Sequence, residues 1–127
     1  MRGAPAIAIV AALALAVELH KRDFSSVEEL QTFVEQSLAH LRTSRPTAVN
    51  LFEAAERLET LLHRHAKHSG ADAAGIKAAL LAEIEAMMAA DVSDNRAIGM
   101  YGAAAILTGL PAEAKVRVLT HCNTGRI

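Results

Sequence analysis

The chain of 127 residues has the length of one domain; 52% of it is hydrophobic, only 3% is aromatic, and 27 residues are alanine. The alanine bias favours helices and argues against an all-β sandwich. Thirteen Lys and Arg against fourteen Asp and Glu give a formal net charge of -1. Binding to a phosphate backbone requires a basic excess, so we expect no nucleic-acid partner. The single cysteine, Cys122, cannot form an internal disulfide, so the cysteine content does not indicate an oxidising compartment.

The first predicted element is a helix over the apolar run from residue 4 to residue 17. With Met1 and Arg2 before it, this run has the outline of a secretory signal peptide, but charged residues follow at once without a polar cleavage spacer. The run is also shorter than the roughly 20 residues that a membrane-spanning helix needs. Pro5 suits the first turn of a helix. We therefore favour a buried helix packed closely on a neighbour over a signal peptide, and we expect no membrane association.

Two amphipathic helices are predicted next. Ser26 and Glu29 form a capping-box pair, after which apolar residues recur at three- and four-residue steps until about Leu41. A helix-breaking segment follows, and Pro46 can occupy the first turn of the next helix. This helix has a second apolar stripe and stops at the polar segment 67–70. The two stripes consist of Val27, Leu30, Val34, Leu38 and Leu41, and of Leu51, Ala55, Leu58 and Leu62.

The histidines at the end of this second helix invite a metal hypothesis. His65 and His68 share a face of the helix, but His63 lies on the opposite side, so the three side chains cannot converge without unwinding. Histidines near a helix C-terminus interact favourably with its dipole, and this interaction accounts for their position without a metal ion. We expect neither a metal ion nor another cofactor.

The last part of the chain changes character. Apolar residues from Ile76 to Met87 mark a further helix, and Asp94 can cap another one that runs to about Leu107. Residues 115–121 are typical of a short strand, and residues 122–125 of the turn after it. The sequence therefore predicts a mainly α chain of about five helices. Residues 1–112 form a helical region, and residues 113–127 begin an incomplete α/β domain, because a single strand needs a partner.

Four short motifs stand out along the chain. They are Arg2-Gly3-Ala4-Pro5-Ala6-Ile7, Arg45-Pro46-Thr47-Ala48-Val49-Asn50, Asp94-Asn95-Arg96-Ala97-Ile98-Gly99 and Val118-Leu119-Thr120-His121-Cys122-Asn123-Thr124-Gly125. In this order they closely resemble the motifs of the methylthioribose-1-phosphate isomerase family, and the resemblance extends over essentially the whole chain. It is specific because four separate strings match in sequence.

The resemblance implies an α/β parent fold with a Rossmann-like domain, and an aldose–ketose isomerase of methionine salvage. That enzyme converts 5-methylthioribose 1-phosphate to 5-methylthioribulose 1-phosphate. It implies that Arg2, Gly3, Ala4 and Arg45 bind the sugar phosphate, and that Cys122 is catalytic, either as a base or as a stabiliser of the transition state. It further implies a homodimer of the full-length protein and a cytoplasmic location, and it permits a nuclear fraction.

The same resemblance implies that this chain is a truncated form. The acid aspartate and the other substrate contacts of the family lie in a C-terminal domain, and Arg126 and Ile127 depart from the family pattern. We therefore expect the 127 residues to be inactive alone. Three alternatives stay open: a ribose-1,5-bisphosphate isomerase, a non-catalytic regulatory module related to subunits of the exchange factor for translation initiation, and an oligomerisation module.

Overall fold

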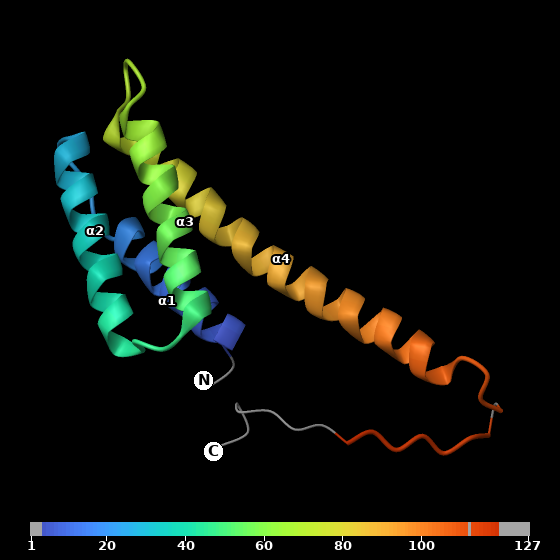
Figure 1. The fold of residues 1–127 in the computed structure, drawn as a ribbon. Coiled ribbons are helices and arrows are strands. Elements are labelled where there is room, and N and C mark those ends of the chain that lie inside the picture. Colours follow the sequence, from blue (N-terminus) through green and yellow to red (C-terminus); the bar gives the residue numbers. More distant parts are fainter. Residues whose placement is uncertain (1–3, 112, 120–127) are drawn as a thin grey trace.

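The structure, a computed structural model, describes residues 4–111 and 113–119 of the chain. Within these ranges it contains four helices, labelled in Figure 1: α1 (Ala4–His20), α2 (Val27–Ser44), α3 (Val49–Ala66) and α4 (Ala73–Leu107). The first three helices and the first half of α4 pack together as a bundle, and the rest of α4 extends away from it. We call residues 91–107 the α4 extension.

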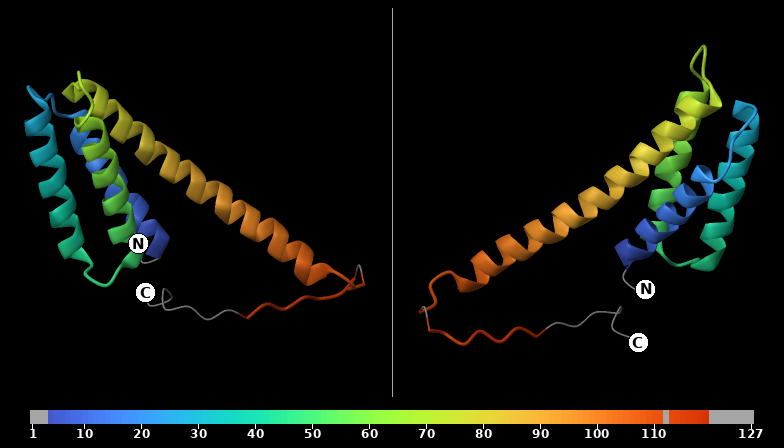
Figure 2. Two further views of the ribbon diagram at one scale, coloured as in Figure 1. Left: turned by 45° about the horizontal axis from the view of Figure 1, so that its top comes forward. Right: turned by 180° about the vertical axis from the view of Figure 1, so that it is seen from behind.

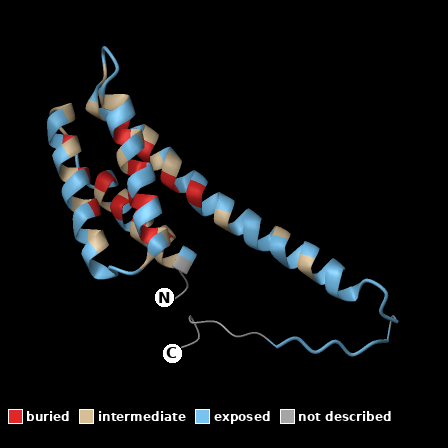
Figure 3. Cartoon of the chain, in the orientation of Figure 1, coloured by how far each residue is buried: buried red, intermediate tan, exposed pale blue. Residues whose placement is uncertain are grey.

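The core consists of the apolar stripes of all four helices. Figure 3 shows that the buried residues gather in the bundle and end about halfway along α4. In α1 the small residues Ala8 and Ala12 are buried beside Leu15 and Leu19, which lets α1 pack closely on α3 and α4. The prediction of a buried first helix is thus confirmed, and the predicted stripes of α2 and α3 supply the rest of the core together with the first half of α4. The remaining buried apolar residues are Leu30, Val34, Leu38, Leu51, Ala54, Ala55, Leu58, Leu62, Ile76, Leu80, Ile84 and Met87.

The predicted capping pair is present at the start of α2, with one difference in the partner of the Glu29 carboxylate. The Ser26 hydroxyl accepts a hydrogen bond of 3.2 Å from the Glu29 backbone N–H, as expected. The Glu29 carboxylate, however, accepts from the Ser25 backbone N–H at 2.8 Å and from the Ser25 hydroxyl at 2.6 Å. These bonds to the charged form lower the pKa of Glu29, the hydroxyl of Ser25 having the largest effect.

The loop between α2 and α3 corrects two predicted boundaries. Helix α2 continues past Leu41 to Ser44, and Pro46 does not open α3, which begins at Val49. The Ala48 backbone N–H donates to the Arg45 carbonyl at 3.0 Å and closes a turn over Arg45 to Ala48. Pro46 occupies the second position of this turn, where its fixed φ is favourable.

Helix α4 corrects the count of helices, because it is one element where the sequence suggested two. Its N-cap is Asp72, whose side chain accepts from the Gly75 N–H at 2.5 Å. Asp94, predicted as a cap, lies inside the helix, and the neighbouring Asn95 side chain donates to the Asp91 carbonyl at 2.8 Å. An Asp caps a helix only where the chain before it is not helical, and residues 86–93 contain neither Gly nor Pro to break it.

The predicted strand is not formed in residues 115–119, which belong neither to a helix nor to a strand. A strand is stabilised by the ladder to a neighbour, and the described part of the chain supplies none. The rest of the predicted strand and its turn lie outside the described residues. The turned views in Figure 2 keep this segment and the C-terminal part of the α4 extension clear of the bundle. Among the described residues, no helix has the length and apolar character needed to cross a membrane.

Candidate functional site at the α1 and α3 start

Two of the five predicted site residues lie in the described part of the chain. Arg45 follows the end of α2, and Ala4 is the first residue of α1. Arg2, Gly3 and Cys122 lie outside the described residues, so the structure does not test their roles. Figure 1 shows that the start of α1 and the loop containing Arg45 occupy the same end of the bundle.

Arg45 is an exposed residue in the loop that joins α2 to α3. It is the C-cap of α2, with φ -147° and ψ 76°, and its carbonyl closes the turn described above. The turn therefore fixes the backbone of Arg45 while its guanidinium stays accessible to solvent. A guanidinium is permanently charged and can bond two phosphate oxygens at once, which makes this position suited to an anionic ligand.

The end of α2 that precedes Arg45 is tied to α3 by a partly buried ion pair. The Arg42 guanidinium donates to both carboxylate oxygens of Glu59, at 2.6 and 2.8 Å. It also lies over the ring of Phe52, 5.9 Å from the centroid. The hydrogen bonds to Glu59 raise the pKa of Arg42 further above its ordinary value. Arg42 therefore stays charged and holds the base of the Arg45 loop on α3.

A cavity of about 300 Å³ lies between the start of α1, the start of α3 and the middle of α4. Three of the four motifs contribute to it: Pro5 comes from the motif at 2–7, Asn50 from the motif at 45–50, and Asp94 from the motif at 94–99. These segments lie far apart in the sequence, and the packing of α1 on α3 and α4 brings them together. Asn50 and Asp94 were not among the predicted site residues. Their membership of the motifs was the available signal, but a motif does not say which of its side chains face a cavity.

The charged side chains that line this cavity are mostly acidic. Glu53, Asp91 and Asp94 line it, together with Arg57 as the basic member. The Nε of Arg57 donates to the Glu83 carboxylate, so its charge is already paired. Carboxylates repel a phosphate but accept hydrogen bonds from sugar hydroxyls. The charged side chains that line the cavity can therefore accept hydrogen bonds from hydroxyl groups of a ligand and disfavour an anionic group.

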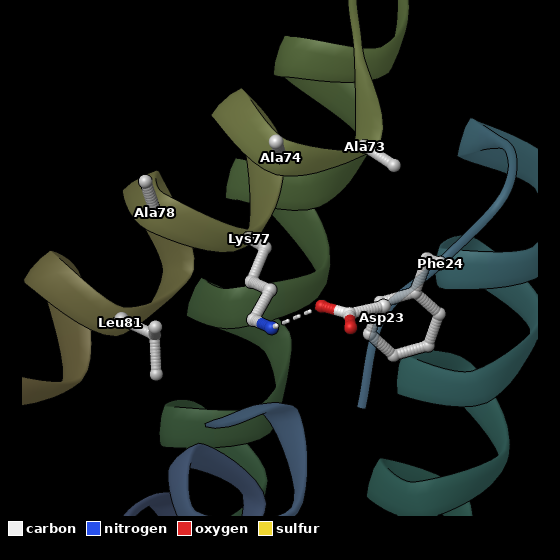
Figure 4. A pocket seen from close by; sticks show the side chains of 7 residues that line it. All are labelled: Asp23, Phe24, Ala73, Ala74, Lys77, Ala78 and Leu81. Atoms are coloured by element: carbon white, nitrogen blue, oxygen red, sulfur yellow. Dashed lines mark ion pairs between the residues drawn. The ribbon is translucent and has the colours of Figure 1, made fainter. Parts of the chain in front are cut away.

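A second cavity, also about 300 Å³, lies at the other end of α1, and Figure 4 shows its lining. It is mostly apolar. The Lys77 Nζ donates to the Arg22 carbonyl at 2.6 Å and lies 3.9 Å from the Asp23 carboxylate, which fastens the start of α4 to the α1–α2 link. None of the described residues that line it belongs to a motif. We assign it a structural role.

The histidines considered as metal ligands lie near the C-terminus of α3. The Nε2 of His63 is 3.6 Å from the Glu35 carboxylate on α2, and the rings of His65 and His68 meet edge to face at 6.3 Å. Across residues 4–111 and 113–119, no group of three or more His, Cys, Asp or Glu side chains is arranged to hold a metal ion.

Comparison with known proteins agrees with the resemblance of the motifs. The model of the Initiation factor 2 subunit family matches residues 1–127. The chain belongs to this family. Its relatives include proteins named methylthioribose-1-phosphate isomerase.

The similarity to these relatives is high and covers the whole of this chain. It is 51% identical over 134 residues to the methylthioribose-1-phosphate isomerase of Talaromyces marneffei, and 47% identical over 128 residues to that of Trichoplax adhaerens. The identity to that of Zea mays is 48% over 128 residues. Each alignment covers 100% of this chain and 35% of the relative. The chain thus spans about a third of the length of the curated relatives that it matches.

Proposed function

We propose that these 127 residues form the part of an aldose–ketose isomerase that holds the sugar phosphate, with 5-methylthioribose 1-phosphate as substrate and 5-methylthioribulose 1-phosphate as product. The observation that supports this most is the meeting of three motifs around one cavity, through Pro5, Asn50 and Asp94. The identity of 47–51% to proteins named as isomerases of this substrate supports it independently. We further propose a cytoplasmic location, with a nuclear fraction permitted.

The chemistry of the substrate determines what the site must do. Its anomeric oxygen carries phosphate, so the ring cannot open by simple loss of a hydroxyl proton. Isomerisation must move a hydrogen from C2 to C1. The protein therefore has to hold a phosphate dianion and manage that hydrogen. Arg45 is placed to bind the phosphate because its guanidinium is exposed on a fixed turn.

The remaining proposed roles follow the motifs. Arg2 supplies a second guanidinium, and the backbone of Gly3 and Ala4 approaches the ligand closely, which the absence of a side chain at Gly3 allows. Cys122 acts on the reacting carbon atoms as a base or as a stabiliser of the transition state. None of these roles needs a metal or an organic cofactor.

The acidic cavity favours a substrate with one phosphate over ribose 1,5-bisphosphate. A second phosphate in the cavity would meet the carboxylates of Glu53, Asp91 and Asp94, with Arg57 already paired to Glu83. Like charges at such close range repel. A sugar whose far end is uncharged avoids this repulsion, so we favour the methylthio sugar.

We propose that the 127 residues do not turn over the substrate by themselves. Arg45 is exposed, and the cavity lined by Pro5 and Asn50, at the same end of the bundle, is open to solvent. Electrostatic stabilisation of a developing charge depends on excluding water from the site. The two thirds of the relatives' length that this chain does not match would supply the missing wall.

A chimera tests this function directly. In the Talaromyces marneffei relative, the matched third is replaced by these 127 residues, and formation of the ketose phosphate is measured. We expect isomerisation by the chimera and none by the 127 residues alone. Arg45→Ala in the chimera should lower kcat/KM by about a hundredfold or more, since a bidentate phosphate contact is lost. Arg64→Ala, an exposed arginine near the other end of α3, serves as the control and should leave kcat/KM unchanged.

Other outcomes of the same experiment would replace the proposal. Preferential turnover of ribose 1,5-bisphosphate would assign the alternative substrate. A folded chimera without either activity would favour a non-catalytic regulatory or oligomerisation module, which the family description also accommodates. Turnover by the 127 residues alone would contradict the proposed need for a second wall.

A further inference from the structure

The four residues that join α2 to α3 contribute no buried side chain to the core. Arg45, Pro46 and Thr47 are exposed, and Ala48 is partly buried. The hydrogen bond from the Ala48 N–H to the Arg45 carbonyl holds the shape of this link but not its place on the bundle. A link this short follows the two helix ends that it joins. The position of the Arg45 guanidinium therefore depends on how firmly the end of α2 is held against α3.

The end of α2 lies beyond most of its contacts with the core. Leu38 is the last buried residue of α2, and Leu41 is the last of its apolar side chains to pack, partly buried, against the core. Contact between apolar side chains is not directional, so it does not by itself fix the rotation of the helix end. A directional contact is needed for that, and in the described part of the chain the last turn of α2 makes it with α3 through Arg42.

Arg42 contacts α3 at two positions that are two turns apart. Its guanidinium donates to both carboxylate oxygens of Glu59 and lies over the ring of Phe52. Phe52 and Glu59 are seven residues apart, so they share a face of α3. A bidentate pair fixes direction as well as distance. The only other ion pair between α2 and α3 among the described residues joins Glu35 to His63 at 3.6 Å; it is more exposed and lies about two turns farther from the link.

We propose that Arg42 and Glu59 are positioning residues for phosphate binding, because they hold the turn at Arg45 in place before the ligand arrives. The inference rests on the proposed function, in which Arg45 binds the phosphate. A side chain that is already positioned loses less conformational freedom when it binds. The phosphate is bound in the ground state and in the transition state alike, so this gain is the same in both. Loss of the pair should therefore raise KM and leave kcat nearly unchanged.

Steady-state kinetics of the chimera described above test the inference. We expect Arg42→Ala to raise KM, and the Ki of inorganic phosphate as a competitive inhibitor, by about three- to tenfold, with kcat changed by less than about twofold. Arg42→Lys keeps the charge but loses the paired bonds, so it should give a smaller rise in both. Ile76→Val is the control for stability. It removes a buried methyl group near the start of α4, at the opposite end of the bundle from the Arg45 link (Figure 1), and should lower Tm without changing KM or Ki.

Glu59→Leu separates positioning from electrostatic attraction. It breaks the same pair but leaves the Arg42 charge unpaired, so the end of α2 becomes more positive. We expect KM and Ki to rise as in Arg42→Ala. A fall in both would show that charge alone governs phosphate binding, and it would overturn the inference.

The remaining outcomes distinguish this inference from the proposed function. Unchanged KM and Ki in Arg42→Ala would overturn the inference alone, provided that Arg45→Ala still lowers kcat/KM. A chimera in which Arg45→Ala leaves kcat/KM unchanged would overturn both. Circular dichroism checks the fold of each variant, and Arg42→Lys, the mildest change, decides the result where Arg42→Ala does not fold.

Discussion

The Arg42 guanidinium and the Glu59 carboxylate face each other across α2 and α3 with two parallel hydrogen bonds of 2.6 and 2.8 Å. Each side chain is only 25% exposed, which distinguishes this pair from the exposed Lys21–Glu18 pair at the C-terminal end of α1. Hydrogen bonds between charged groups gain strength when water is partly excluded. The pair therefore fixes the end of α2 from which the Arg45 loop departs.

Removing this pair should destabilise the bundle. We expect Arg42→Ala to lower the free energy of unfolding by about 1 to 2 kcal/mol, because Glu59 loses both of its hydrogen bonds in a partly buried setting. Chemical denaturation followed by circular dichroism measures the change. Lys21→Ala, which breaks the exposed pair, is the control and should change stability by less than about 0.5 kcal/mol. Equal effects of the two substitutions would show that the Arg42–Glu59 geometry contributes nothing beyond an ordinary surface pair.

A second prediction concerns the buried apolar stripe of α3. Leu58 is fully buried in the core between the helices. Leu58→Ala removes apolar contacts and leaves a cavity, so we expect a loss of about 2 to 5 kcal/mol in unfolding free energy. Val49 begins the same helix and is 68% exposed. Val49→Ala should stay within about 0.5 kcal/mol of the original chain. A small loss at Leu58 would contradict the packing described here.

Two glycines should respond to alanine in opposite directions. Gly99 is inside α4 with open space where a Cβ would lie, so Gly99→Ala should favour the helix by about 0.5 to 1 kcal/mol. Gly70 lies between α3 and α4 with φ at 85°, also with open space around it. Gly70→Ala should instead destabilise the chain by about 1 kcal/mol, because alanine avoids positive φ. Helical ellipticity and thermal unfolding measure both effects, and a gain in stability at Gly70 would contradict the turn geometry.

The Glu29 carboxylate should make stability depend on pH. Its pKa is lowered by hydrogen bonds from Ser25, so the folded state favours the charged form. The resulting stabilisation is present above the ordinary pKa of Glu and is lost as the pH falls through the lowered value. Glu29→Gln should therefore reduce Tm at about pH 7 and have less effect at about pH 3. Glu85→Gln, an exposed carboxylate on α4, is the control. An equal loss of Tm for Glu29→Gln at both pH values would contradict this role.

The sequence by itself determined the helices of the bundle and the residues that form its core. The stripes beginning at Val27 and Leu51 recur at helical spacing, and their members at Leu30, Leu58 and Leu62 are all fully buried. The prediction of these helices succeeds because helical periodicity is local, so it can be detected in the sequence alone. The end of α4 near Leu107 was equally legible, since Gly109 follows the C-cap residue with a positive φ. The stop at 67–70 was predicted too, and there α3 ends at Ala66 while Gly70, also with positive φ, lies in the turn that follows.

Only the tertiary structure decided which motifs meet. Asn50 and Asp94 are 44 positions apart in the chain, and no local rule places them on one cavity; the packing of α1 on α3 and α4 does. Tertiary context also decided that residues 115–119 form no strand, because a strand depends on a paired neighbour. Local spacing fixes which face of a helix is apolar, but the partner of that face is set by contacts between distant segments.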